Sequence, residues 1–155
     1  MPSETGTSLR NSNVGVPLGS DAFVSDFVEK KLLGRLLATV TRLEDFEDSQ
    51  AATYLLRVSY SIVRAVHFMR TTPLNQWRKQ ASTFDSMMRR SIERILGFPM
   101  DDAAFTQACL TPKLGGLGLR KTVEHADLAF QASWHESKRM KFGTLPLEVG
   151  IRLSG

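Results

Sequence analysis

Residues 73–97 read PLNQWRKQASTFDSMMRRSIERILG, and this stretch carries the sharpest helical pattern in the chain. Pro73 suits a helix start and Gly97 suits the position just past a helix end, so we predict a helix that ends near Leu96. Apolar residues recur at the three- and four-residue spacing that places them on one helix face; they are Leu74, Trp77, Phe84, Met88, Ile92 and Ile95. The opposite face carries Lys79, Thr83, Ser86, Arg90 and Arg94, and Arg78 and Arg89 flank it. The stretch therefore predicts a basic ridge on a helix that is anchored by aromatic residues.

The same period of 3.6 residues continues on both sides of this helix. It predicts further helices at about residues 21–46, 49–71, 102–110 and 122–140, the first of them capped by Ser20 or Asp21. The stripes expected in the core are Val28, Leu32, Leu33, Leu36, Val40 and Leu43; Leu55, Leu56, Val58, Ile62, Val63, Val66 and Met69; and Val123, Ala126, Phe130 and Trp134. Because no segment alternates with period two, we predict an all-α fold, a single compact bundle of about five helices.

The rest of the sequence predicts a single domain with an arm before it and a tail after it. Residues 1–13 are rich in Ser, Thr and Asn and predict a disordered arm, while residues 141–155 predict a loosely ordered tail. The helical domain is expected to span residues 14–140. With 155 residues and 42% hydrophobic content, the chain is long enough to bury a real core.

The sequence also indicates in which cellular compartment the protein is expected. No apolar run is long enough to cross a bilayer, and the polar first residues lack the apolar core of a secretory signal. The single cysteine, Cys109, cannot form an internal disulfide, and its apolar neighbours predict a small buried hydrophobe rather than a nucleophile. We expect an intracellular protein, nuclear or cytoplasmic, that is neither secreted nor membrane-bound.

The net charge of +4 is unevenly distributed. Residues 1–48 carry five Lys and Arg against eight Asp and Glu, whereas residues 49–100 carry eight against two. An excess of this kind is expected of a surface that faces a polyanion, and equally of a solvated helix face.

A glycine-rich segment, Leu114 to Arg120, follows the predicted fourth helix. Gly115, Gly116 and Gly118 predict a tight turn that packs one helix against the next, with the leucines buried. Its flanking Lys113, Arg120 and Lys121 also allow a rim that faces phosphate. The segment is neither a dinucleotide fingerprint nor a P-loop, because no strand precedes it and no Gly-Lys-Ser/Thr follows.

No constellation of catalytic residues is evident. The string Met100-Asp101-Asp102 predicts a helix start rather than a polymerase metal site, since a helical run follows it directly. His67, His125 and His135 contain no pair at the spacing of zinc ligands. We therefore expect no catalytic residues, no metal and no cofactor, and a function in binding.

Several short segments, taken in order, resemble the region just downstream of the polymerase palm in non-LTR retroelement reverse transcriptases. They are Gly15-Val16-Pro17-Leu18-Gly19 with Phe23-Val24, Leu56-Arg57, His67 to Pro73, Phe84-Asp85, Ile95-Leu96-Gly97, Ala103 to Ala108, and Leu114 to Arg120 leading into His125-Ala126. The resemblance spans about residues 14–140. It implies a thumb-like domain that clamps a template–primer duplex, with Val16 to Gly19 as a remnant of the primer-grip turn.

The fingers, the palm and the catalytic aspartates of that family have no counterpart in these 155 residues. The expected function is thus non-catalytic binding of the nucleic-acid backbone, RNA or a DNA–RNA duplex, without sequence readout. The residues expected to contact it are Arg70, Arg78, Lys79, Arg89, Arg90, Arg94, Lys113, Arg120 and Lys121. The alternative is a helical protein–protein module or a decayed retroelement fragment. An upstream polymerase domain or a second copy would then cover an apolar patch, expected along Val28 to Leu43.

Overall fold

The computed structural model describes residues 15–142, and within them the chain forms helices and no strand. The all-α prediction is confirmed. The elements in chain order are α1 (Asp21–Val28), η1 (Glu29–Leu33), α2 (Gly34–Glu44), α3 (Ser49–Leu55), η2 (Leu56–Tyr60), α4 (Ile62–Thr71), η3 (Leu74–Gln76), α5 (Arg78–Leu96), α6 (Asp102–Ala108), η4 (Pro112–Leu114) and α7 (Thr122–Phe142). The predicted arm, residues 1–13, lies outside the described residues. So does the predicted tail apart from residues 141 and 142, which belong to α7.

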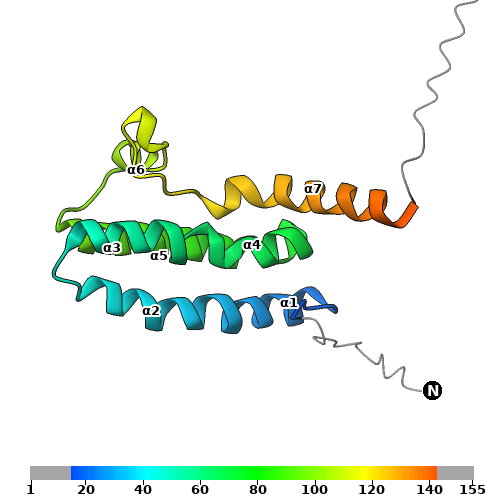
Figure 1. Ribbon diagram of the computed structural model, residues 1–155. Coiled ribbons are helices and arrows are strands. Elements are labelled where there is room, and N and C mark those ends of the chain that lie inside the picture. The colour runs from blue at the N-terminus through cyan, green and yellow to red at the C-terminus, as the bar shows by residue number, and fades with distance from the viewer. Residues whose placement is uncertain (1–14, 143–155) are drawn as a thin grey trace, which may run out of the picture.

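The helices form three layers (Figure 1). The segment from α1 to α2 makes the lower layer, α3, α4 and α5 make the middle layer, and α7 lies above α4 and α5. The short helix α6 lies at the end of the bundle where α7 begins, and the last turns of α7 project beyond α4. The middle layer is thus covered on both sides, which places the core around α5.

The lower layer is a single helical rod, as predicted, with a π-helical stretch, η1, in its middle. The predicted stripe is buried: Val28 is fully buried, and Leu32, Leu36, Val40 and Leu43 are at most 4% exposed. The prediction of an exposed apolar patch along Val28 to Leu43 is therefore wrong, because α5 and η2 cover this face.

The second predicted helix is present but interrupted. It runs through α3 and the π-helical η2, breaks at Ser61, whose ψ is −143°, and resumes as α4. Asp48 caps its start by accepting hydrogen bonds from the backbone nitrogens of Gln50 and Ala51. The break rotates the apolar stripe, because a π-helical turn and a kink both shift the faces of a helix.

The expectation that this stripe lies wholly in the core is consequently wrong for three residues. Val58, Val63 and Val66 are 38%, 54% and 39% exposed. A similar correction applies to the last helix, α7, where Trp134 is 55% exposed although it belongs to the predicted stripe.

The helix α5 is the centre of the core. Pro73 precedes it as predicted, although a 3-10 turn, η3, comes first, and Gly97 ends it with a left-handed φ of 77°. Trp77 and Phe84 are fully buried, and the indole Nε1 of Trp77 donates to the carbonyl oxygen of Thr72 at 3.1 Å. Burying an aromatic side chain of this size stabilises the fold by roughly 2 to 3 kcal/mol.

The glycine segment is a packed turn, as predicted. Gly115 and Gly118 adopt φ values of 79° and 73°, and a Cβ on Gly116 would lie 2.0 Å from the carbonyl oxygen of Leu110. The segment therefore needs glycine for two separate reasons, left-handed backbone and close approach. The expected burial of its leucines holds for Leu119, at 2% exposed, and is wrong for Leu114, at 68%.

Asp85 of α5 positions the start of α7. Its carboxylate accepts hydrogen bonds from the backbone nitrogens of Thr122, at 2.7 Å, and Val123, at 3.1 Å. Burial raises the pKa of Asp85, and the two backbone hydrogen bonds oppose that rise. The side chain acts as an N-terminal cap supplied from another helix.

Candidate nucleic-acid interface

The nine residues predicted to contact nucleic acid do not form one surface. Five of them are paired with carboxylates: Arg70 with Glu136, Arg78 with Asp127, Arg89 with Glu93 and Asp102, Arg94 with Glu44, and Lys121 with Glu124. Among the described residues the other four, Lys79, Arg90, Lys113 and Arg120, have no ion pair. Lys79 and Arg90 lie on α5, whereas Lys113 lies in the 3-10 helix η4 before the glycine turn and Arg120 lies in the loop after it.

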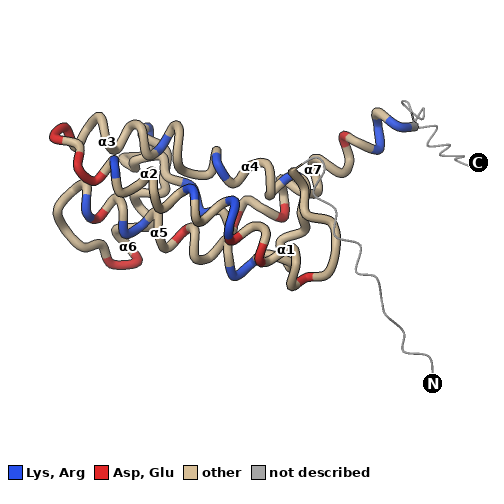
Figure 2. Tube along the Cα trace, turned by 90° about the horizontal axis from the view of Figure 1, so that it is seen from below, with Lys and Arg blue, Asp and Glu red and all other residues tan. Residues whose placement is uncertain are grey.

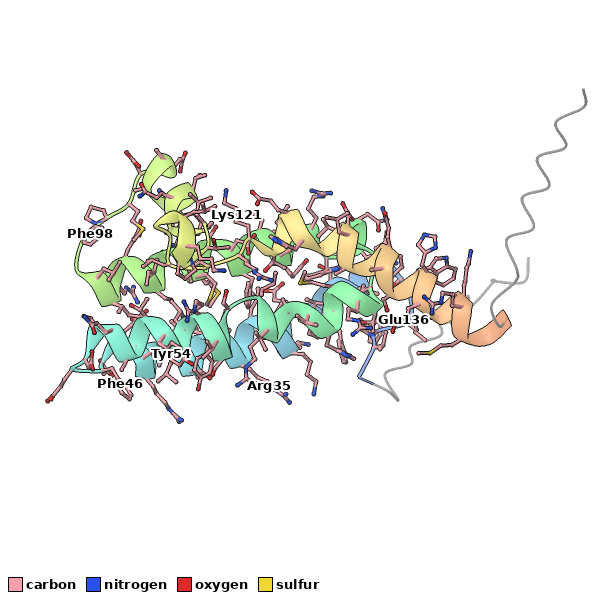
Figure 3. All side chains as sticks on the ribbon, turned by 45° about the horizontal axis from the view of Figure 1, so that its top comes forward. Arg35, Phe46, Tyr54, Phe98, Lys121 and Glu136 are labelled. Carbon is pink, nitrogen blue, oxygen red and sulfur yellow. The ribbon has the colours of Figure 1, made fainter. Side chains whose placement is uncertain are left out.

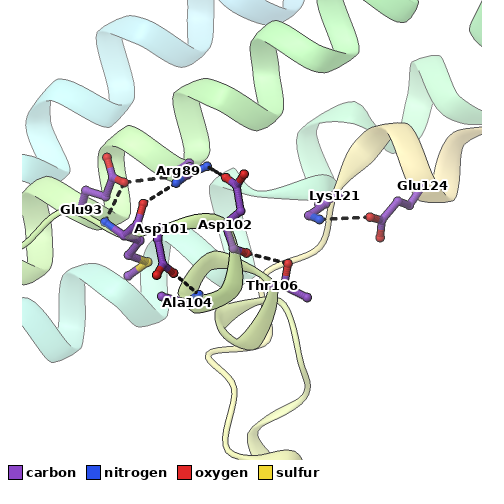
Figure 4. Close-up of polar contacts among 9 residues, drawn as sticks. Arg89, Glu93, Asp101, Asp102, Ala104, Thr106, Lys121 and Glu124 are labelled. Atoms are coloured by element: carbon purple, nitrogen blue, oxygen red, sulfur yellow. Dashed lines mark hydrogen bonds and ion pairs between the residues drawn. The ribbon is translucent and has the colours of Figure 1, made fainter.

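Arg89 has a structural role (Figure 4). Its Nη1 lies 2.6 Å from a carboxylate oxygen of Asp102 and its Nε lies 3.3 Å from Glu93, while Nη2 donates to the carbonyl oxygen of Met100. The guanidinium also lies 5.4 Å from the centre of the Phe105 ring. These contacts join α5 to the start of α6 and leave the side chain few donors for a ligand.

Two of the other ion pairs are exposed and weak. The side chains of Arg78 and Asp127 are each 59% exposed at a separation of 3.9 Å, and those of Arg70 and Glu136 are about half exposed at 3.1 Å. Pairs of this kind are worth about 0 to 1 kcal/mol, so their main effect is to cancel charge on the predicted ridge. Unpaired cations on α5 are reduced to Lys79 and Arg90.

A different basic surface lies on the lower side of the bundle. A groove of about 700 Å³ separates the rod formed by α1, η1 and α2 from the rod formed by η2 and α4. Its cationic side chains come from both rods, and they are Lys31, Arg35, Arg42 and Arg64. Among residues 15–142, no carboxylate lines it. We call this feature the basic groove.

Two of these cations are unengaged. The side chains of Arg35 and Arg42 are exposed and form no hydrogen bond or ion pair within residues 15–142, and Figure 3 shows Arg35 extending away from the core. The acidic residues of this half of the chain lie elsewhere. Figure 2 shows one group of them in the turn between α2 and α3 and others along α1. Asp26 pairs with Lys30, and Glu44 pairs with Arg94 on α5. The basic groove therefore keeps its positive charge.

The other two cations lie over aromatic rings. Lys31 Nζ is 5.9 Å from the centre of the Phe27 ring on one wall, and the Arg64 guanidinium is 5.3 Å from the Tyr60 ring on the other. In both pairs the cation follows the aromatic residue by four positions, the spacing that brings side chains together on a helix. Arg64 is held further by a 3.0 Å hydrogen bond from Nε to the carbonyl oxygen of Ser59.

Both π-helical stretches in the described residues contribute to this groove. Lys31 and Leu32 belong to η1, and Tyr60 is the last residue of η2. Stretches of π-helix are rare and are often found at functional sites, because the widened turn costs stability. Their coincidence at one groove is a second reason, independent of charge, to regard it as the functional site.

His67 closes one end of the basic groove. Its Nε2 lies 3.1 Å from the carbonyl oxygen of Gly15, and its ring meets that of Phe68 edge-on at 5.6 Å. Gly15 begins the segment that resembles the primer-grip turn, in which Pro17 is buried and Leu18 is 61% exposed. The contact fastens this segment beside the groove.

The described residues give little support to a metal site, a reactive cysteine or a membrane-spanning helix. No group of three or more His, Cys, Asp or Glu side chains within residues 15–142 is placed to hold a metal ion. Burial raises the pKa of the Cys109 thiol, which keeps it protonated and in the role of a small hydrophobe. None of the helices in the described part of the chain combines the length and apolar character needed to cross a bilayer.

Comparison of the chain with protein-family models, with curated proteins and with solved structures finds no match. The assignment of a function therefore depends on the groove itself.

The sequence held a signal for the basic groove that the prediction missed. Lys31, Arg35 and Arg42 are spaced four and seven residues apart, which places them on one helix face. The net negative charge of residues 1–48 concealed them, because an average over a segment does not show which face of a helix each charge occupies. The contribution of Arg64 could not be seen at all without knowing which helices pack together.

Proposed function

We propose that this chain is a non-catalytic helical module that binds the backbone of nucleic acid without sequence readout, through the basic groove. The observation that carries the proposal is a groove with four cationic side chains from two helical rods and no carboxylate among its lining residues. Phosphate contacts of this kind give affinity and position but no sequence information. The resemblance to the region downstream of a reverse-transcriptase palm is a further reason to choose nucleic acid as the polyanion.

The test is a binding titration at several salt concentrations. Four cations that each neutralise a phosphate predict a slope of log affinity against log salt of about −2.8 for a single strand and about −3.6 for a duplex. Fluorescence anisotropy with labelled RNA, DNA and hybrid duplexes, between about 50 and 200 mM salt, measures the slope directly. Absence of binding at the lowest salt concentration, or affinity that does not change with salt, would contradict the proposal.

A second candidate function is a helical protein–protein module, and exposed apolar side chains favour it. Val63 and Trp134 are more than half exposed, and Val66 is 39% exposed beside Ser133 of α7. Exposed apolar residues that gather on one face mark an interaction site more often than isolated ones do. Sedimentation velocity tests this reading: a monomer at all concentrations would exclude self-association through this face.

A further inference from the structure

We infer that the polynucleotide bound in the basic groove is single-stranded, with its bases turned into the groove and its phosphates on the rims. The inference rests on the proposed function and specifies its ligand. It is argued from the floor of the groove, from its aromatic walls and from its length.

The floor is apolar. Leu32 and Leu36 are each 3% exposed and Phe68 is 7% exposed, so the bottom of the groove is formed by the outer edges of core side chains. A duplex keeps its base faces stacked inside and offers phosphates, sugars and base edges, none of which matches an apolar floor. Unstacked bases do match it, because every base has an apolar face.

The walls carry aromatic residues that are only half-buried, Phe27 and Tyr60. Each lies beneath its own cation, Lys31 and Arg64 respectively. Bases stack on aromatic rings and on guanidinium planes in many single-strand binding proteins, while nearby cations contact the phosphates. Each wall of the basic groove therefore offers an aromatic ring for stacking and a cation for contact with a phosphate.

The length of the groove sets the size of the site. Lys31 and Arg42 are eleven positions apart along one rod, which corresponds to about 16 Å at about 1.5 Å per residue. Unstacked nucleotides are spaced further apart than the about 3.4 Å of stacked ones, so that length holds at most about five nucleotides. The site is thus comparable with the smaller single-strand sites of other folds.

The first experiment compares labelled single strands of about 12 nucleotides, oligo-uridine and oligo-thymidine, with a hairpin duplex of matched length. We expect either single strand to bind at least about tenfold more tightly than the duplex at about 50 mM salt. Equal or tighter binding of the duplex would overturn the inference and leave the proposed function in place. Failure of all three probes to bind would overturn the proposed function as well.

The second experiment tests the aromatic wall with two variants of one residue. Tyr60→Leu removes the ring and should weaken single-strand binding by about 5- to 150-fold, whereas Tyr60→Phe keeps the ring and should retain it. Duplex binding should not change in either variant. Equal single-strand affinity for both variants would overturn the inference, and thermal melting followed by circular dichroism shows whether each variant is folded.

A third measurement uses the unaltered protein. A strand that carries 5-iodouracil is crosslinked by ultraviolet light and the protein is digested with trypsin. We expect the crosslink in the peptide of residues 58–64, which contains Tyr60, or in that of residues 11–30, which contains Phe27. Crosslinks confined to peptides from α5 or α7 would overturn the inference.

Discussion

Removing two cations from the basic groove should lower both the affinity for nucleic acid and its dependence on salt. The double variant Arg35→Gln/Arg42→Gln keeps most of each aliphatic stem and removes two of the four positive charges. Neither side chain has a hydrogen bond or an ion pair in the described part of the chain, so the fold should be unaffected.

The magnitude follows from counterion release. Each phosphate contact to a single strand contributes about 0.7 to the salt slope, so the slope should change from about −2.8 to about −1.4. Between about 50 and 200 mM salt, the affinity of the unaltered protein should fall about 50-fold and that of the variant only about sevenfold. At about 0.1 M salt the variant should bind about 25-fold more weakly, or about 1.9 kcal/mol.

The assay is fluorescence anisotropy with a labelled oligonucleotide, and the matched control is Lys79→Gln/Arg90→Gln. These are the two α5 cations that are free of ion pairs among the described residues, and they belong to the ridge predicted from the sequence. We expect the control to bind like the unaltered protein. If the control loses affinity and the groove variant does not, the reasoning from the groove is refuted and the sequence-based ridge is the better interface.

Three further predictions concern the fold. Gly116→Ala should destabilise the protein by about 1 to 3 kcal/mol, because its Cβ would meet the Leu110 carbonyl oxygen at 2.0 Å. Gly34→Ala, with nothing within 4 Å, should instead stabilise helix α2 by about 0.5 to 1 kcal/mol; chemical denaturation measures both, and equal effects would contradict the packing argument. Arg89→Glu should lower the melting temperature and Arg90→Glu should not, since only Arg89 joins α5 to α6; similar melting of the two variants would remove that assignment. The raised pKa of Asp85 means that the folded state takes up its proton at higher pH than the unfolded state does, so acidification through that pKa should favour the folded state. The melting temperature of the unaltered protein should therefore rise relative to that of Asp85→Asn between about pH 7 and pH 4; the opposite trend would mean that the two backbone hydrogen bonds outweigh burial.

Local chemistry determined much of the fold. The left-handed end of α5 at Gly97 and the left-handed turn at Gly115 and Gly118 were predictable, because each depends on the conformational range of one residue. Pro73 marked the start of the segment, although a 3-10 turn follows it and α5 itself begins at Arg78. The burial of Trp77 and Phe84 was predictable from their spacing alone.

The break at Ser61 was not predictable in the same way. A π-helical stretch forms where tertiary packing offsets the free-energy cost of a widened turn. No residue in η2 requires such a turn by itself. The exposure of Val63 and Val66 follows from that break, so a helical wheel drawn through the whole segment placed them wrongly.

The sequence by itself determined that the chain forms helices, where most of them begin and end, and which residues carry its positive charge. Only the tertiary structure decided which of those charges remain available. Arg89 and Arg94 find carboxylates on other elements, whereas Arg35 and Arg42 come to line a groove with Arg64. The physical reason is that a charge is cancelled or left free by its neighbours in space, and those neighbours are brought together by the burial of apolar faces rather than by their order along the chain.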